Sequence, residues 1–173
     1  MAKLDDLFFQ RDVLEVAPDL IGKILVRQFD NGEILRYRIT ETEAYRGSED
    51  LACHASKGRT NRTEVMYHSG ALIYVYLIYG IHWMLNFVAG GEDNPQAALL
   101  RGLEGLNGPG KLTKMLKIDK SFYAEDISVS NRLWVENDNI EAVYTRNPRI
   151  GINYAGSWKD KPWRYTLVNS SKK

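Results

Sequence analysis

The stretch Ile34-Leu-Arg-Tyr-Arg-Ile-Thr-Glu-Thr-Glu43 has the alternating pattern of a β-strand. Its apolar side chains from Leu35 to Ile39 form one face, and the same period of two places Glu41 and Glu43 on that face. A carboxylate in such a position lies either at the solvated end of the strand or inside the protein. The stretch alone favours the solvated end, because glutamate is mostly exposed. Burial would instead raise its pKa and make it a better proton acceptor near neutral pH.

The residues before this strand predict a short helix and a β-hairpin. Asp12–Leu20 has one apolar helical face, Asp12 can cap it, and Pro18 predicts a kink or an early end. A strand over Lys23–Phe29 then reaches Asp30-Asn-Gly-Glu33. Asn-Gly between two apolar strands is a strong hairpin signal, so the carboxylates lie where the hairpin's second strand enters a long loop.

Within the loop from Tyr45 to Gly70, Lys57, Arg59 and Arg62 are spaced among Gly, Ser, Thr and Asn residues. These residue types are good phosphate ligands, by charge or by hydroxyl and amide groups. An ordinary polar surface loop has the same composition. The length favours a functional loop, since more than about 15 residues without regular structure are uncommon in a compact domain.

The most apolar run, Ala71–Ala89, is almost long enough for a membrane helix. Its tyrosines, its β-branched residues and a central Gly80 instead favour two strands, Leu72–Leu77 and His82–Val88, with a turn between them. Tyr79 then lies at a hairpin tip. An apolar side chain that projects into water indicates a partner, and a wedge between DNA bases is one such use.

Gln96–Leu103 is predicted to be a strand, and Arg101 within it lies at an edge or pairs with a buried acid. The following Gly105–Lys111 fits the phosphate-loop pattern, but Leu112 stands where that loop needs a hydroxyl and Pro109 removes an amide. We therefore reject nucleotide hydrolysis. Lys111, at the start of a helix over 112–116, remains a candidate phosphate ligand.

The rest of the chain shows strands and turns. Strands are expected at Leu133–Val135, Ile140–Tyr144 and Trp163–Leu167, and the glycine-rich Arg149–Gly156 is a candidate site lining. The tail Ser170–Lys173 is expected to be loose. The pattern is that of an α+β fold with a mostly antiparallel sheet, and we expect residues 1–173 to form a single domain.

Composition excludes several functional classes. With 23 basic and 22 acidic residues, the chain is no globally basic nucleic-acid coat, so nucleic-acid binding must come from local patches. A single cysteine, Cys53, rules out an internal disulfide and fits a reducing compartment, and no N-terminal signal is evident. The three histidines have no paired spacing, so we expect no metal site.

Together these stretches resemble the alkyladenine (3-methyladenine) DNA glycosylase family. Glu-Thr-Glu-Ala-Tyr combined with Tyr-x-Tyr-x-x-Tyr-Gly is far more specific than any single motif. The matching segments follow the family's order and cover nearly the whole chain: Leu20–Val26, Glu41–Tyr45, His54, Tyr74–Gly80, Asn86, Leu99–Arg101, Gly108–Leu112, Arg149–Ile152 and Ala155–Gly156.

The resemblance implies a curved antiparallel sheet with surrounding helices and a protruding hairpin. It implies hydrolysis of the N-glycosidic bond of alkylated or deaminated purines, of the 3-methyladenine, hypoxanthine and ethenoadenine class, in duplex DNA. By the resemblance, Glu43 is the general base that activates water, and Arg101 holds the water and the carboxylate. The flipped base would lie between the ring of Tyr45 and the rings of His54 and Tyr76. Asn86 would form the pocket floor, and Tyr79 would be the intercalating side chain. The DNA phosphates would contact Lys57, Arg59, Arg62 and Lys111.

This reading predicts a monofunctional enzyme of base excision repair, because the lysines of the matched segments lie outside the pocket and a Schiff base is not expected. We expect damaged double-stranded DNA as the partner, no membrane contact, no cofactor, a monomer, and a location with the DNA inside the cell. One alternative is a catalytically silent nucleic-acid-binding module on the same scaffold. Another is a sugar-directed glycosidase using Glu41 and Glu43, whose Cα atoms would lie about 7 Å apart on a strand.

Overall fold

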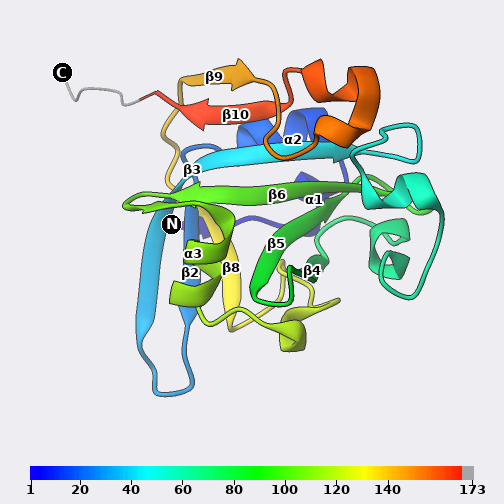
Figure 1. Cartoon of the computed structure of the whole chain (residues 1–173). Helices are drawn as coiled ribbons and strands as arrows, with labels where there is room; N and C mark the ends of the chain where they lie inside the picture. Colours follow the sequence, from blue (N-terminus) through cyan, green and yellow to red (C-terminus); the bar gives the residue numbers. More distant parts are fainter. Residues whose placement is uncertain (169–173) are drawn as a thin grey trace.

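The computed structural model describes residues 1–168, and one antiparallel sheet runs through them (Figure 1). Its main path has the order β1-β8-β2-β3-β6-β5-β4, β10 pairs with β3 and β9, and β7 pairs with β6. The strands are β1 (Ala2–Lys3), β2 (Ile24–Gln28), β3 (Ile34–Arg46), β4 (Ile73–Ile78), β5 (His82–Ala89), β6 (Gln96–Leu103), β7 (Leu106–Asn107), β8 (Leu133–Asn137), β9 (Tyr144–Asn147) and β10 (Arg164–Leu167).

The helices are short. They are α1 (Asp6–Phe9), α2 (Val13–Asp19) and α3 (Pro109–Met115), with 3₁₀ turns η1 (His54–Lys57), η2 (Glu64–Tyr67), η3 (Lys120–Phe122) and η4 (Asn153–Asp160). This arrangement confirms the predicted α+β class with a curved, mostly antiparallel sheet. Among the described residues, no helix is long and apolar enough to cross a membrane.

Strand β3 is the centre of the architecture, and it pairs with three different strands along its length (Figure 1). Its first part pairs with β2 and its second part with β6, with register shifts between Ile39 and Thr42. Glu43 lies opposite Leu99 of β6 and opposite Arg164 of β10. The backbone at Glu43 is therefore held on both sides, and the strand continues to Arg46, three residues beyond its predicted end.

Helix α2 covers the part of β3 that carries the carboxylates. The Asp12 side chain accepts a hydrogen bond from Leu14 N–H as the N-cap, and the helix ends at Asp19, as Pro18 predicted. The buried Thr42 hydroxyl donates to Ala17 O at 2.7 Å. Because side chains alternate along a strand, this bond turns Thr42 toward the helix and Glu43 the opposite way.

The predicted hairpin at the apolar run is confirmed. Strands β4 and β5 pair from Ile73↔Phe87 to Ile78↔His82, and the turn lies between them. Tyr79 has φ +52° and is followed by Gly80 at φ +68°. Its side chain is 87% exposed, so the ring contributes little to the core.

Three expectations need correction. No strand forms over residues 140–143, and β9 begins only at Tyr144. The side chains of Asn137 and Asp138 accept hydrogen bonds from the backbone N–H groups of residues 139 and 140, and these bonds form turns before the strand. The loop Tyr45–Gly70 contains η1 and η2 and is not structureless. Helix α3 begins at Pro109 rather than at Leu112. The tail Ser170–Lys173 lies outside the described residues.

Candidate active site

A cavity of about 340 Å³ opens beside the end of β3. Its lining comes from the end of β3 and the loop after it, from the β4–β5 hairpin, from β6, from the first residue of α3 and from residues 150–154. Six residues predicted for the site are in that lining, together with one loop cation: Tyr45, His54, Tyr76, Tyr79, Asn86, Arg101 and Arg62. The fold therefore gathers at one place residues that are far apart in the sequence.

Glu43 lies directly behind this lining and is completely buried. Its Oε2 accepts a hydrogen bond from the Tyr45 hydroxyl at 2.7 Å, and its Oε1 accepts one from Ile150 N–H, also at 2.7 Å. Both donors belong to residues that line the cavity. The carboxylate thus sits one layer below the cavity surface, and the sequence expectation of a solvated strand end is wrong.

Arg101 lies between the two carboxylates of β3. Its Nε is 3.5 Å from Glu41 Oε1 and 3.6 Å from Glu43 Oε1, and Arg164 donates to Glu41 Oε1 at 3.0 Å. Arg101 Nε is buried and makes no hydrogen bond within the described residues. These contacts are ion pairs, longer than a hydrogen bond and too short for a water molecule to lie between the atoms.

Burial raises the pKa of Glu43, against the opposing effects of Arg101 and of the hydrogen bonds from Tyr45 and Ile150. Burial and the Glu43 charge together hold the pKa of Tyr45 well above its usual value, so Tyr45 remains a hydroxyl donor. A carboxylate with a raised pKa is a stronger proton acceptor than an ordinary glutamate. The arrangement is therefore suited to general-base chemistry.

Aromatic rings form one side of the cavity. The His54 and Tyr76 ring centroids are 4.5 Å apart, and His54 Nδ1 lies 2.8 Å from the Tyr74 hydroxyl. Burial, helped by the charges of Arg62 and Lys57, lowers the pKa of His54 to about 4. His54 is therefore neutral at pH 7, and the rings offer flat surfaces on which a planar base can stack.

Asn86 is almost fully buried in the lining. Its side-chain N–H donates to Tyr74 O at 3.1 Å, which fixes the orientation of the amide. The residue lies opposite Tyr74 on β4 and Leu99 on β6. Asn86 is therefore held rigidly at the place where two strands meet below the cavity.

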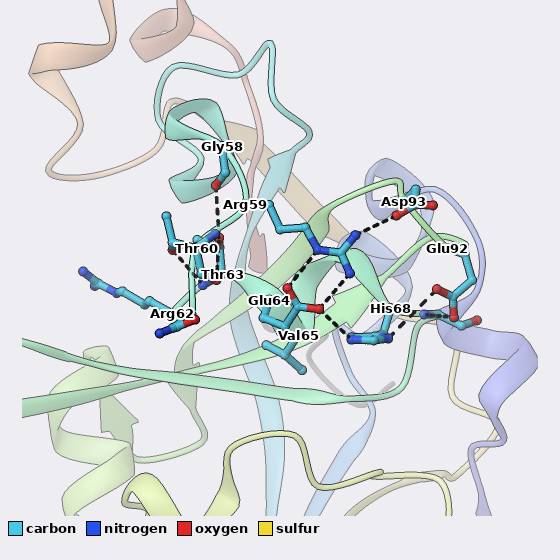
Figure 2. A network of polar contacts seen from close by, with 12 residues as sticks. Gly58, Arg59, Thr60, Arg62, Thr63, Glu64, Val65, His68, Glu92 and Asp93 are labelled. Carbon is cyan, nitrogen blue, oxygen red and sulfur yellow. Dashed lines mark hydrogen bonds and ion pairs between the residues drawn. The ribbon is translucent and has the colours of Figure 1, made fainter.

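The three predicted cations of the loop have different surroundings. Figure 2 shows Arg59 between Glu64 and Asp93, with contacts of 2.7 Å to Glu64 Oε1 and 3.1 Å to Asp93 Oδ1. Lys57 and Arg62 have no carboxylate partner among the described residues, and both line a second cavity of about 280 Å³ that adjoins the first. The Arg62 guanidinium also lies 4.9 Å from the Tyr76 ring centroid.

The glycine-rich segment before Lys111 does not form a phosphate loop. Gly105 turns the chain between β6 and β7, and Pro109 is the first residue of α3. Lys111 is exposed on α3 and has no carboxylate partner within residues 1–168. No group of three or more His, Cys, Asp or Glu side chains in that range is placed to hold a metal ion.

Sequence reasoning missed two contributions to the site. The Ile150 amide contacts Glu43, and Tyr154 lines both cavities. Because nearly every residue has a backbone N–H group, the identity of a residue does not show that its amide is a donor in a site. Only the glycine-rich character of Arg149–Gly156 indicated that this segment lines a site.

Comparisons with known proteins show which family the chain is similar to. A family model described as methylpurine-DNA glycosylase matches residues 7–106 and 105–171. A protein of Psychrobacter cryohalolentis is 45% identical over 91% of this chain and 88% of its own length. A protein of Natranaerobius thermophilus is 44% identical over 95% of both chains, and one of Borrelia garinii is 43% identical over 96% of this chain and 97% of its own. Each carries the name "Putative 3-methyladenine DNA glycosylase".

The raised pKa of Glu43 predicts a pH-dependent difference in stability between the wild type and Glu43→Gln. A group whose pKa is raised by folding destabilises the protein as the pH rises through that pKa, because the folded state must then hold a buried charge. The Gln variant keeps the shape without this loss. Its melting temperature, measured by circular dichroism from pH 4 to pH 8, should exceed that of the wild type by a margin that grows with pH. If the difference in melting temperature became smaller or changed sign as the pH rises, ionised Glu43 would not destabilise the folded protein.

Proposed function

Because the chain belongs to the methylpurine-DNA glycosylase family, whose members are hydrolases acting on N-glycosyl bonds, we propose that it releases alkylated or deaminated purines from duplex DNA. The proposed substrates are of the 3-methyladenine, hypoxanthine and ethenoadenine class, and the proposed acting form is a single-domain monomer. The observation that carries the proposal is the fully buried Glu43 carboxylate, hydrogen-bonded directly behind an aromatic-lined cavity.

The cavity supports a mechanism in which the damaged nucleotide leaves the helix. A base inside a duplex cannot be reached, so it must be extruded at a cost of a few kcal/mol, least for a damaged pair. The volume lies within the range of small-molecule sites, about 300–1,000 Å³, and the rings of Tyr45, His54 and Tyr76 restore stacking. Lys57, Arg62 and Lys111 are the proposed phosphate ligands, with Arg59 a weaker one because two carboxylates already share its charge.

The chemistry follows from the positions of Arg101 and Glu43. A water molecule bound in the cavity beside Arg101 and Glu43 gives a proton to the Glu43 carboxylate as its oxygen attacks C1′ of the sugar. The C1′–N bond breaks, and its electron pair leaves with the base. The carboxylate also stabilises the oxocarbenium-like charge on the sugar. No lysine is in the lining formed by the described residues, which favours base release without a Schiff base or strand cleavage.

Glu43→Gln should abolish base release and leave lesion-DNA binding nearly unchanged. The shape persists, but the proton acceptor is lost, and removal of a general base costs about 10²–10⁴-fold in rate. The measurement is single-turnover release from duplexes containing 3-methyladenine, hypoxanthine or ethenoadenine. Glu41→Gln is the matched control and should lose much less, because Glu41 contacts Arg101 and Arg164 without the donors that hold Glu43. Wild-type binding without any release would favour the silent module.

Tyr79→Ala should slow release from paired DNA and leave the fold intact. The ring is exposed at the hairpin tip, where it can fill the space of the extruded nucleotide. Stacking on an aromatic ring contributes about 1–3 kcal/mol per base, so a loss of about tenfold or more is expected in duplex DNA. The loss should be smaller when the lesion is in a bulge. Val129→Ala, at another exposed apolar position, is the control. Equal losses in duplex and bulge would indicate a pocket residue.

Asn86→Ser should shift selectivity toward guanine. We propose that the rigid Asn86 amide excludes the 2-amino group that guanine has and hypoxanthine lacks. Steric exclusion at one group is worth about 1–3 kcal/mol, so release of methylated guanine relative to hypoxanthine should rise about tenfold or more. The ratio is measured in single-turnover assays on matched duplexes. An unchanged ratio would place the selectivity elsewhere.

A further inference from the structure

Asp50 and Arg149 form a buried ion pair behind the cavity wall. Both side chains are fully buried, Arg149 Nη1 donates to Asp50 Oδ2 at 2.6 Å, and Nη2 donates to Oδ1 at 2.9 Å. Asp50 lies in the loop between Tyr45 and His54, and Arg149 directly precedes Ile150. Two distant parts of the chain are thus joined by a two-point contact, which holds orientation as well as distance.

Each member of the pair also holds backbone. Asp50 accepts from Arg46 N at 3.1 Å and from Ala52 N at 3.0 Å, while Arg149 donates to Ala44 O at 2.9 Å and to Trp158 O at 3.3 Å. The pair therefore ties together the end of β3, the loop that follows it and the segment that enters η4.

Both groups that donate to Glu43 lie next to this pair. The Arg149 guanidinium carbon is 4.8 Å from the Tyr45 ring centroid. Tyr45 lines the cavity and Arg149 does not, so the guanidinium packs on the ring from the side away from the cavity. The next residue along the chain, Ile150, supplies the amide that donates to Glu43 Oε1.

Stability alone does not account for a pair in this position. Removing two charges from water costs free energy that their attraction often fails to recover, and apolar replacements of buried pairs are frequently neutral or stabilising. The pair instead fixes the relative positions of the end of β3, the loop after it and the segment that enters η4. It does so through the bidentate contact and four further hydrogen bonds to the backbone.

We propose that the Asp50–Arg149 pair is a positioning element for the reaction, which holds the Tyr45 ring and the Ile150 amide against the Glu43 carboxylate. The inference rests on the proposed function of Glu43 as the base. Neither side chain touches the substrate, and both act through the two donors.

The test uses the double variant Asp50→Asn/Arg149→Gln, in which both residues are neutral, the salt bridge is lost and each side chain keeps at most part of its bonds to the backbone. Single-turnover release at saturating enzyme should fall about 10-fold to 100-fold, because a displaced reacting group costs rates of this order. Affinity for lesion DNA should change far less. The double variant removes the charges of both Asp50 and Arg149, and Arg149 is the member of the pair that lowers the pKa of Glu43. The pH below which release declines should therefore rise. The other groups around Glu43 remain, and they are Arg101, Glu41, Tyr45, Tyr76, Tyr154 and the Ile150 amide.

Arg149→Lys separates charge from geometry and serves if the double variant does not fold. Lysine keeps the positive charge but lacks the planar fork. Release should therefore slow while the pH dependence stays near that of the wild type. The matched control is Arg38→Gln/Asp138→Asn, a pair with a 2.7 Å contact outside the site, which should keep the wild-type rate and pH dependence.

Folding of each variant is checked by thermal melting. A folded double variant with wild-type rate and pH dependence would overturn the proposal, as would Arg149→Lys at full rate. A readout independent of activity is the ¹³C carboxyl titration of Glu43, assigned by its disappearance in Glu43→Gln, which should move to higher pH in the double variant. Wild-type protein that releases no base would refute the proposed function, whereas this titration would still test the placement of Glu43.

Discussion

The complete burial of the Glu43 carboxylate is the constraint on which the rest of the site depends. An ionised carboxylate removed from water is strongly disfavoured unless hydrogen bonds and opposite charge compensate it. Here two donors come from Tyr45 and Ile150, and the positive charge comes from Arg101. The compensation is partial, since the pKa of Glu43 remains raised. The ionised form of Glu43 therefore has a higher free energy than it would have in water, and uptake of a proton is correspondingly more favourable.

The fold supplies this environment by using β3 in two ways. Its first part is an ordinary hairpin partner of β2, whereas its last part is paired with β6 on one side and β10 on the other. The irregular register between Ile39 and Thr42 separates the two parts. Beyond it, Thr42 is tied to α2 and Glu43 faces the cavity side, so the same short stretch contributes to the core and to the site. A strand at the sheet edge would leave the carboxylate exposed to water.

Much of the fold could be predicted from local patterns. The Asn-Gly turn, the apolar hairpin with Tyr79 and the Arg101 strand carry signals within a few residues, and the structure confirms them. The burial of Glu43 was not predictable from its strand, because the groups that cover its carboxylate include the Ile150 amide and Arg101, which are far away in the sequence. The start of β9 was missed for a related reason, since the side chains of Asn137 and Asp138 compete with the sheet for backbone amides. The roles assigned to the site residues stay predictions, because they concern a bound nucleotide.

The surroundings of the arginines suggest how a chain of net charge +1 can act on a polyanion. Arg101 and Arg149 form ion pairs with carboxylates at the site, and Arg59 forms ion pairs with Glu64 and Asp93 on the loop. The positive charges of these three arginines are therefore largely compensated within the protein. Lys57 and Arg62 have no such partner among the described residues and line the cavity next to the aromatic rings. Under the proposed function, these two cations would meet the phosphate groups that flank an extruded nucleotide. Under the proposed function, a uniformly basic surface would hold DNA equally well anywhere, whereas cations that line the cavity favour the register that brings one nucleotide to Glu43.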